Sequence, residues 1–413
     1  MLEKPLSLMY LAQSLLITVC VFFSFIKVAD SATDGAYTVT SSYTGETFHN
    51  LEGGLKRGSA YLDNLNVSLE IDGEAAWGVQ GLNVMGSLLY NNGAAFSSEY
   101  TGDDQGITNI EAVEAIRLYE LWAQWQLGES KDRSILFGLY DLNSEFDVIP
   151  SAGLFIGASH GIGRDYSQTG DNGPSIFPVT SLALRYQAQL NSQWQWQVAL
   201  LDGVPGDPDR PERTTINLSS DDGALFAAEL FQETANGSKL ALGYWQYSAS
   251  FEQLPSLAKQ DGTVHSSRNN RGAYVLADMA LIPAIDLTEA PKLSTFFRVG
   301  TANDKINRFS HYIGTGLVLR NSLMPEIDNE LGLAFSYARN GNYWVGSQGL
   351  EGLEGLEGTE AESHETIAEL TWKMQAQPWL SLQPTIQYVI NPNADSQLNN
   401  ALALGIRFEL SLL

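Results

Sequence analysis

Cysteine is almost absent from this chain of 413 residues, since the only one, Cys20, lies within the first apolar stretch. If that stretch is removed, no disulfide framework or thiolate metal site is possible. Positive charge is also scarce, with 23 Lys and Arg residues against 48 Asp and Glu residues and a formal net charge of −25. This balance argues against nucleic acid as a partner, because phosphate binding is driven by clustered basic residues.

Long apolar runs are confined to the beginning of the chain. Lys4 precedes a run over residues 6–26, and small residues follow it. This arrangement predicts a cleavable signal peptide over residues 1–31, which leaves a mature chain of residues 32–413. An uncleaved membrane anchor is the alternative, because the run is long and Asp30 lies in the cleavage region.

No later segment has the ~20 consecutive apolar residues that a membrane-spanning helix needs. Apolar and polar residues alternate instead, which is typical of half-buried strands. Clear examples of this alternation are residues 65–71, 119–127, 182–190, 194–198, 331–337, 380–390 and 402–412. About sixteen such segments fit between Tyr37 and Leu412, most of them long enough to cross a membrane as barrel strands.

The connections between these segments are of two kinds. Short turns such as Asn191-Ser192 and Asn236-Gly237 alternate with long stretches rich in Gly, Asp, Ser and Pro. The long stretches are residues 91–110, 142–180, 202–222 and 252–271. The pattern predicts an all-β, up-and-down antiparallel transmembrane β-barrel in a bacterial outer membrane.

A soluble β-sandwich or propeller is the alternative fold, since alternation also occurs there. Export, aromatic residues near several strand ends and a final strand that runs to the chain terminus all favour the barrel. Residues 110–118 have apolar residues at helical spacing, so a short helix is expected before the strand that follows.

Several blocks resemble the carbohydrate-selective porins of the OprB-like family. The most distinctive is Gly-Leu-Tyr-Asp-Leu-Asn-Ser-Glu-Phe-Asp at 138–147. Further similar blocks, in order along the chain, are 104–106, 109–111, 117–122, 170–178, 378–384 and 387–392. The resemblance implies a sixteen-stranded barrel with a loop-narrowed pore that passes sugars. The chain departs from the family at its end, because porins usually close on an outward-facing aromatic residue and this chain ends Leu412-Leu413.

The polar phase of the strands is the candidate solute pathway. A polar residue between lipid-facing apolar neighbours must face the lumen, because a charge on the lipid face costs a few kcal/mol. Amide and charged groups there can replace water around sugar hydroxyls, and an aromatic ring can cover the apolar face of a sugar. The candidates are Glu120, Trp122, Gln124, Arg185, Gln187, Gln195, Glu369, Lys373, Gln383, Gln387, Arg407 and Glu409.

The expected function is passive diffusion of hydrophilic solutes, with no covalent step, cofactor or metal. The expected partners are outer-membrane lipid and mono- and oligosaccharides, and a homo-oligomer is compatible with this interpretation. Two alternatives remain. The acidic composition suggests a general cation-preferring porin, although acidic loops alone could supply that charge.

The other alternative is an outer-membrane hydrolase. Residues 157–161 match Gly-x-Ser-x-Gly around Ser159 and His160, but that nucleophile motif requires a strand before the serine and a helix after it. A glycine-rich loop is the simpler interpretation. The five histidines are dispersed and show no metal-ligand spacing.

Overall fold

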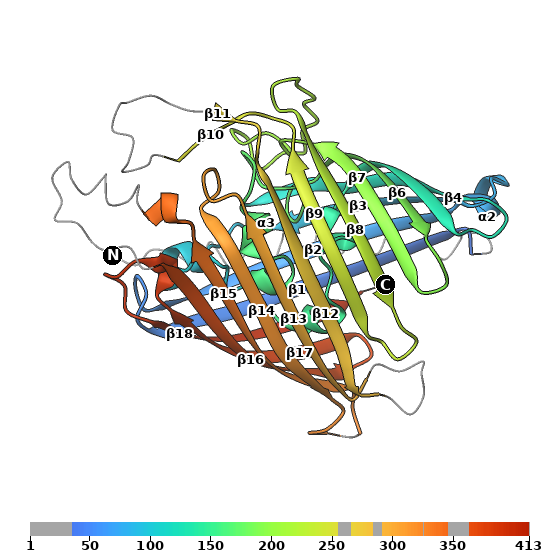
Figure 1. The fold of residues 1–413 in the computed structure, drawn as a ribbon. Coiled ribbons are helices and arrows are strands. Elements are labelled where there is room, and N and C mark those ends of the chain that lie inside the picture. Colours follow the sequence, from blue (N-terminus) through green and yellow to red (C-terminus); the bar gives the residue numbers. More distant parts are fainter. Residues whose placement is uncertain (1–34, 255–265, 284–290, 325, 346–362, 413) are drawn as a thin grey trace, which may run out of the picture.

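A computed structural model describes residues 35–254, 266–283, 291–324, 326–345 and 363–412 of the chain. Sixteen antiparallel strands form a closed barrel, and β10 (Phe251–Glu252) and β11 (Ser266–Ser267) form a separate two-stranded sheet (Figure 1). The barrel strands are β1 (Tyr37–Glu52), β2 (Gly58–Asp72), β3 (Leu82–Asn91), β4 (Ala115–Leu127), β5 (Arg133–Tyr140), β6 (Ser181–Gln189), β7 (Trp194–Asp202), β8 (Ala224–Glu233), β9 (Lys239–Tyr247), β12 (Arg271–Ile282), β13 (Leu293–Ala302), β14 (Phe309–Arg320), β15 (Asn329–Asn340), β16 (His364–Gln377), β17 (Leu380–Ile390) and β18 (Ala401–Ser411).

The barrel closes between its first and last strands. β1 pairs with β18 in an antiparallel register that sets Glu46 opposite Arg407. Every other strand pairs with its sequence neighbours in the barrel, so no strand has a free edge. Closure satisfies the backbone hydrogen bonds of all sixteen strands, which is the condition for crossing a membrane with strands.

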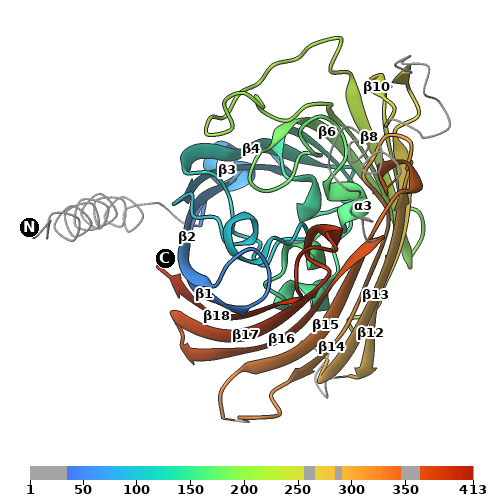
Figure 2. The same ribbon diagram turned by 90° about the vertical axis from the view of Figure 1, so that its left-hand side faces the viewer.

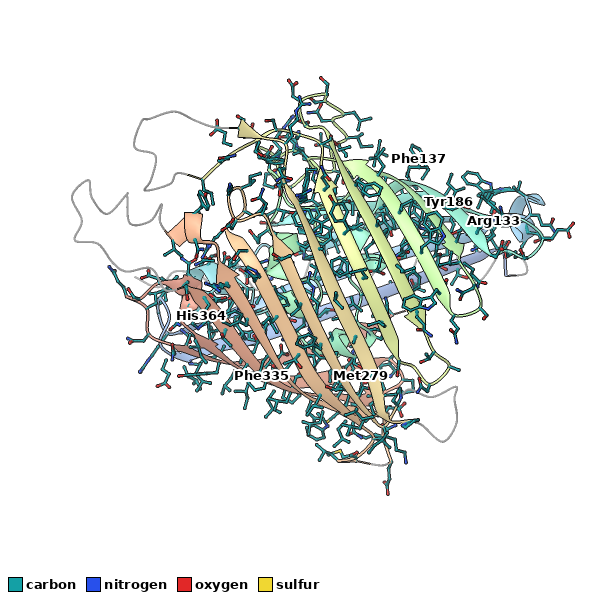
Figure 3. The ribbon with its side chains drawn as sticks, viewed as in Figure 1. Arg133, Phe137, Tyr186, Met279, Phe335 and His364 are labelled. Atoms are coloured by element: carbon teal, nitrogen blue, oxygen red, sulfur yellow. The ribbon has the colours of Figure 1, made fainter. Side chains whose placement is uncertain are left out.

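The two faces of the wall differ in polarity, as the alternation predicts. On β12, Tyr274 and Asp278 are buried on the inner face, whereas Val275 and Met279 are exposed on the outer face. Apolar side chains such as Met279 and Phe335 project outward from the barrel (Figure 3). Among the described residues, no helix has the length and apolar character needed to span a membrane.

The connections separate by length between the two ends of the barrel. Short turns, such as residues 190–193 and 234–238, join strands at one end, which we call the short-turn end. Connections at the opposite end, the long-loop end, include residues 92–114, 141–180 and 203–223. Viewed from the side turned by 90°, coil and short helices fill much of the space inside the ring of strands (Figure 2).

The predicted helix over residues 110–118 is wrong. Residues 110–114 form a turn and coil, and β4 begins at Ala115, where it pairs with β3 and Ile116 faces outward. Pairing along the barrel therefore overrides a local helical spacing. A π-helical turn, η1 (Ser97–Thr101), occurs earlier in the same connection. The predicted signal peptide, residues 1–31, lies outside the described residues.

Closure of the barrel predicts resistance to detergent denaturation at room temperature. The hydrogen-bonded ring has no edge at which unfolding could begin. The full chain extracted in SDS without heating should migrate differently on a gel from the same sample after boiling. Equal mobility of heated and unheated samples would contradict the closed barrel.

Candidate functional site

The connection between β5 and β6, residues 141–180, folds into the barrel and crosses its lumen (Figure 2). We call it the inner loop. It contains four short helical turns, η2 (Leu142–Ser144), η3 (Pro150–Leu154), η4 (Ala158–His160) and α3 (Arg164–Ser167). Because its backbone is irregular, its N–H and C=O groups need partners from the wall.

Arg298 of β13 joins the inner loop to the wall through two buried carboxylates. Its Nε donates to Asp147 Oδ1 at 2.9 Å, and its Nη2 donates to Asp147 Oδ2 at 2.7 Å. Its Nη1 donates to Asp165 Oδ1 at 2.5 Å. The guanidinium also lies 5.3 Å from the ring centroid of Tyr274 and 5.2 Å from that of Tyr312. This arrangement supplies every charge in the cluster with an opposite charge, which a buried ion requires.

Other wall carboxylates accept hydrogen bonds from backbone N–H groups of the inner loop. Charge-assisted bonds of this kind are stronger than bonds between neutral groups. They join Glu229 on β8 to Asp147 N at 3.0 Å, Asp278 on β12 to Ser151 N at 2.7 Å, and Glu369 on β16 to Ile156 N and Gly157 N, both at 2.9 Å. The wall thus fixes the path of the loop along much of its length.

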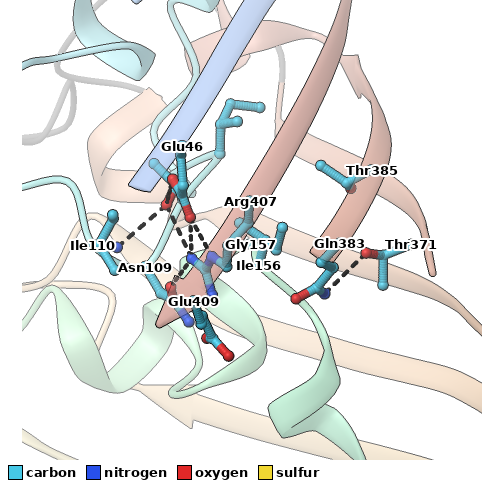
Figure 4. A network of polar contacts seen from close by, with 12 residues as sticks. Glu46, Asn109, Ile110, Ile156, Gly157, Thr371, Gln383, Thr385, Arg407 and Glu409 are labelled. Carbon is cyan, nitrogen blue, oxygen red and sulfur yellow. Dashed lines mark hydrogen bonds and ion pairs between the residues drawn. The ribbon is translucent and has the colours of Figure 1, made fainter. Parts of the chain in front are cut away.

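A second inward segment, residues 92–114, is fixed by a separate set of side chains. Glu365 of β16 accepts from the backbone N–H groups of Asp104, at 3.0 Å, and Gln105, at 2.9 Å. Arg407 of β18 donates to Glu46 and, at 2.6 Å, to Asn109 Oδ1 (Figure 4). The barrel seam between β1 and β18 is therefore also an anchoring point for this segment.

The two inward segments are bonded to each other. The N–H of Asn109 donates to the carbonyl of Ile156 at 2.9 Å, and the N–H of Ala158 donates to the carbonyl of Gly106 at 3.0 Å. Together they form a constriction that narrows the lumen, with both segments anchored to the strands around it.

The predicted pathway residues fall into two groups by exposure. Six are buried, and these are Glu120, Arg185, Glu369, Gln383, Gln387 and Arg407. The other six are half-buried, and these are Trp122, Gln124, Gln187, Gln195, Lys373 and Glu409. The contact of either group with a passing solute stays a prediction.

The buried group bonds mainly to the inward segments. Gln383 Nε2 donates to the carbonyl of Leu154 at 2.7 Å, and Gln387 Nε2 donates to that of Ile107 at 2.7 Å. Arg185 pairs with Glu145 of the inner loop at 2.7 Å. The strand alternation thus identified residues that hold the constriction, a role it did not predict.

The half-buried group forms fewer contacts with the loops. Lys373 and Glu409 form an ion pair at 2.7 Å, and Gln187 Nε2 donates to Gln197 Oε1 at 3.3 Å. For Gln195 the structure gives no side-chain hydrogen bond. These side chains retain surface that a solute in the lumen could reach.

Trp122 keeps the inward phase of Glu120 because a bulge in β4 lies before both residues. Ser87 of β3 is opposite Glu120 while Leu88 is opposite Leu118, so Tyr119 is an extra residue. Downstream of the bulge, Trp122 Nε1 donates to Glu120 Oε1 at 3.2 Å and its ring packs against the buried apolar cluster. A bulge shifts the alternation by one residue, so Arg117 and Glu120 are both buried.

Sequence reasoning missed the charged residues that matter most for the constriction. Arg298 and Glu229 follow the same alternation as the predicted set, and that signal could have identified them. Asp147 and Asp165 lie in the inner loop, whose irregular backbone has no periodicity from which the direction of a side chain could be predicted. Glu365 lies four residues before the predicted Glu369 on β16, so the same alternation could have identified it.

Burial shifts the pKa of several inner-loop groups. It raises the pKa of Asp165 to about 6, although Arg298 opposes this shift, and it raises the pKa of Asp141 to about 6 against a hydrogen bond from Tyr119. Burial lowers the pKa of His160 to about 4. The His160 ring packs against Phe155 and Phe296, which explains why its charged form is disfavoured.

The Gly-x-Ser-x-Gly segment lies within the inner loop and has no strand before it. Ser159 Oγ donates to the carbonyl of Gln105 at 3.0 Å, and Ser159 belongs to the single turn η4. Within the described part of the chain, no group of three or more His, Cys, Asp or Glu side chains is placed to hold a metal ion. The segment therefore lacks the strand and helix that a nucleophile elbow requires.

A closed sixteen-stranded barrel with an apolar outer face, a polar inner face and a loop-narrowed lumen is the architecture of an outer-membrane porin. Residues 56–412 match the model of the family described as "Carbohydrate-selective porin, OprB family". The chain belongs to this family, whose members are channels, and it is a protein of the bacterial outer membrane.

Individual relatives are distant in sequence. Porin B of Pseudomonas aeruginosa is 21% identical over 401 residues, which cover 90% of this chain and 87% of that protein. The high-pH structure of Pseudomonas putida OprB is 18% identical, with a TM-score of 0.81 over 91% of this chain and 94% of that one. The outer-membrane channel DcaP of Acinetobacter baumannii is 10% identical, with a TM-score of 0.56 over 91% of this chain and 97% of that one. These structural similarities show the shared barrel fold.

The contacts of Arg298 predict that Arg298→Met will loosen the constriction. The substitution leaves Asp147 and Asp165 buried without a cation, and breaking a buried pair in this way costs about 3–5 kcal/mol. Single-channel recordings should show higher conductance or frequent transitions to larger conductance levels. Arg133→Met, at an exposed position at the short-turn end, is the matched control and should conduct like wild type. Wild-type traces from Arg298→Met would mean that the cluster does not hold the loop.

The depressed pKa of His160 predicts that acid will favour release of the inner loop. A released imidazole titrates near 6.5, whereas the buried one titrates near 4, so its stabilising contribution is complete above pH 6.5 and is lost as the pH falls toward 4. His160→Phe keeps an aromatic ring and removes this contribution. Conductance fluctuations of wild type should therefore increase more between pH 7 and pH 4.5 than those of the variant.

Asp165 also contributes to the pH dependence of both wild type and His160→Phe. Because its pKa is raised to about 6, it contributes the opposite slope, with stability that declines as the pH rises from 3.8 to 6. That contribution is common to both proteins and cancels in the difference between them. Identical pH profiles for wild type and His160→Phe would contradict a role for His160.

Proposed function

We propose that this porin conducts saccharides by passive diffusion and selects them at the constriction formed by residues 92–114 and the inner loop. The observation that supports this most strongly is the bonding of two inward segments to each other and to wall side chains on both sides. A fixed aperture discriminates by size and by hydrogen bonding, because it cannot widen freely around each solute. Selectivity of this kind needs no cofactor.

We propose further that the half-buried lumenal residues form the solute pathway. They combine amides with a Lys373–Glu409 ion pair, and a second pair joins Arg320 to Glu330 at 2.5 Å. Paired charges of both signs favour an uncharged hydroxylated solute over a single ion, since neither sign dominates the local field. The acidic net charge of the chain is consequently a poor guide to the preference of the pore.

Passage is proposed to involve no covalent step. Ser159 Oγ bonds to a backbone carbonyl, and no hydrogen bond joins it to His160 within the described structure. A nucleophile and its base must lie within reach of each other to act together. Self-association into a homo-oligomer stays a prediction.

Trp122 tests the pathway directly. Its indole N–H donates to Glu120, and we propose that the half-buried ring presents part of its apolar face to a sugar ring. Trp122→Ala should leave ion conductance equal or higher while weakening the block of ion current by glucose and maltose-type oligosaccharides. The measurement is sugar block in planar bilayers at fixed salt, because a pathway residue separates the two quantities and simple damage to the wall does not.

Trp125 is the matched control for this experiment. It is on the same strand and faces outward, so Trp125→Ala should change neither quantity. Trp122→Phe, which keeps an aromatic ring, should retain most of the sugar block. If conductance and block in Trp122→Ala both equal the wild-type values, Trp122 lies outside the pathway.

A further inference from the structure

A row of six side chains, five of them polar or basic, crosses the outer face of six neighbouring strands near the long-loop end. Each member is paired with the next in the strand register, so all share the outer face. The row, which we call the boundary row, consists of Tyr244, Ala273, Thr301, His311, Arg339 and His364. Figure 3 shows His364 near this end of the barrel and Arg133 near the opposite end.

The next outward-facing row toward the short-turn end is mainly apolar. It consists of Leu242, Val275, Val299, Ile313, Tyr337 and Thr366, which are paired across the same six strands. In an outer-membrane barrel the apolar band faces acyl chains, and polar side chains begin where the headgroups begin. Since long loops are extracellular in such barrels, the boundary row lies at the headgroups of the outer leaflet.

The boundary row carries positive charge that the protein does not neutralise. Arg339 is exposed. Arg271, which lies two residues before Ala273 and therefore on the same face of β12, is exposed as well. Among the described residues, neither guanidinium forms an ion pair with a carboxylate. In a chain with a net charge of −25, two unpaired arginines on one side of the outer face form a local site for an anion.

The surface beside Arg271 is hollowed. An open depression of about 390 Å³ is lined by residues that include Tyr244, Arg271, Thr301 and Asn303. Their hydroxyl, guanidinium and amide groups match the hydroxyls of a sugar as well as a phosphate. The depression therefore places an anion-binding group beside a shallow recess at the edge of the apolar band.

We propose that the boundary row and Arg271 bind the phosphorylated headgroup of an outer-leaflet glycolipid, with its acyl chains on the apolar row below. Guanidinium groups bind phosphate through paired N–H donors, and the imidazole side chains supply further donors. The depression receives a sugar of the headgroup. This site depends on the outer-membrane location of the barrel and is independent of the proposed sugar pathway.

Native mass spectrometry of the purified protein in mild detergent tests the proposal. The probe is a bisphosphorylated glucosamine disaccharide lipid, compared with the same lipid without phosphates and with phosphatidylglycerol. The double variant Arg271→Gln/Arg339→Gln should bind the phosphorylated glycolipid roughly 30-fold more weakly than wild type. Arg133→Gln, which removes an outward-facing arginine at the short-turn end, should bind like wild type.

Three results would overturn the proposal. One is equal affinity of wild type and the double variant for the phosphorylated glycolipid. Another is equally tight binding of the glycolipid without phosphates, and the third is equally tight binding of phosphatidylglycerol, which would indicate a general attraction to anionic lipid. Sugar block of the double variant in zwitterionic bilayers should equal that of wild type, so failure of the lipid site is distinguishable from failure of the sugar pathway.

Discussion

An irregular segment inside a barrel has backbone N–H groups that cannot pair with the backbone of a strand. The constriction of this porin depends on how these groups find other acceptors. Wall carboxylates accept these hydrogen bonds, with Glu369 receiving two and Glu365 two more. Arg298 then balances the negative charge of the inner loop itself. A polar lumen wall is thus a requirement for holding the loop as well as for wetting the channel.

This dual use of polar side chains explains why exposure divides the lumenal residues. Those under the inward segments, such as Gln383 and Gln387, donate hydrogen bonds to loop carbonyls and are buried. Those away from the segments, such as Lys373, remain half-exposed. Polar residues on the same face of the wall therefore have different roles, and the position of each relative to the constriction decides which role it has.

The strands and the direction of their side chains could be predicted from sequence because a period of two is a local property. Arg185 and Glu369 were identified by that rule alone. The partners Asp147 and Asp165 could not be, since their contacts with Arg298 span 151 and 133 residues and depend on the loop path. The short helix expected at 110–118 failed for a related reason, because strand pairing with β3 outweighed local spacing. The bulge at Tyr119 could not be predicted either, because apolar and polar residues alternate regularly downstream of it.

The sequence separation of the loop contacts has a consequence for how the chain assembles. Ile156 bonds to Glu369, 213 residues later, and Leu154 bonds to Gln383, 229 residues later. The inner loop is synthesised long before these two partners exist, so its contacts with β16 and β17 form only after the strands near the C-terminus have been made. The wall is therefore the template on which the loop takes its shape, and the part of the loop around Leu154 and Ile156 reaches its final position only once β16 and β17 are present.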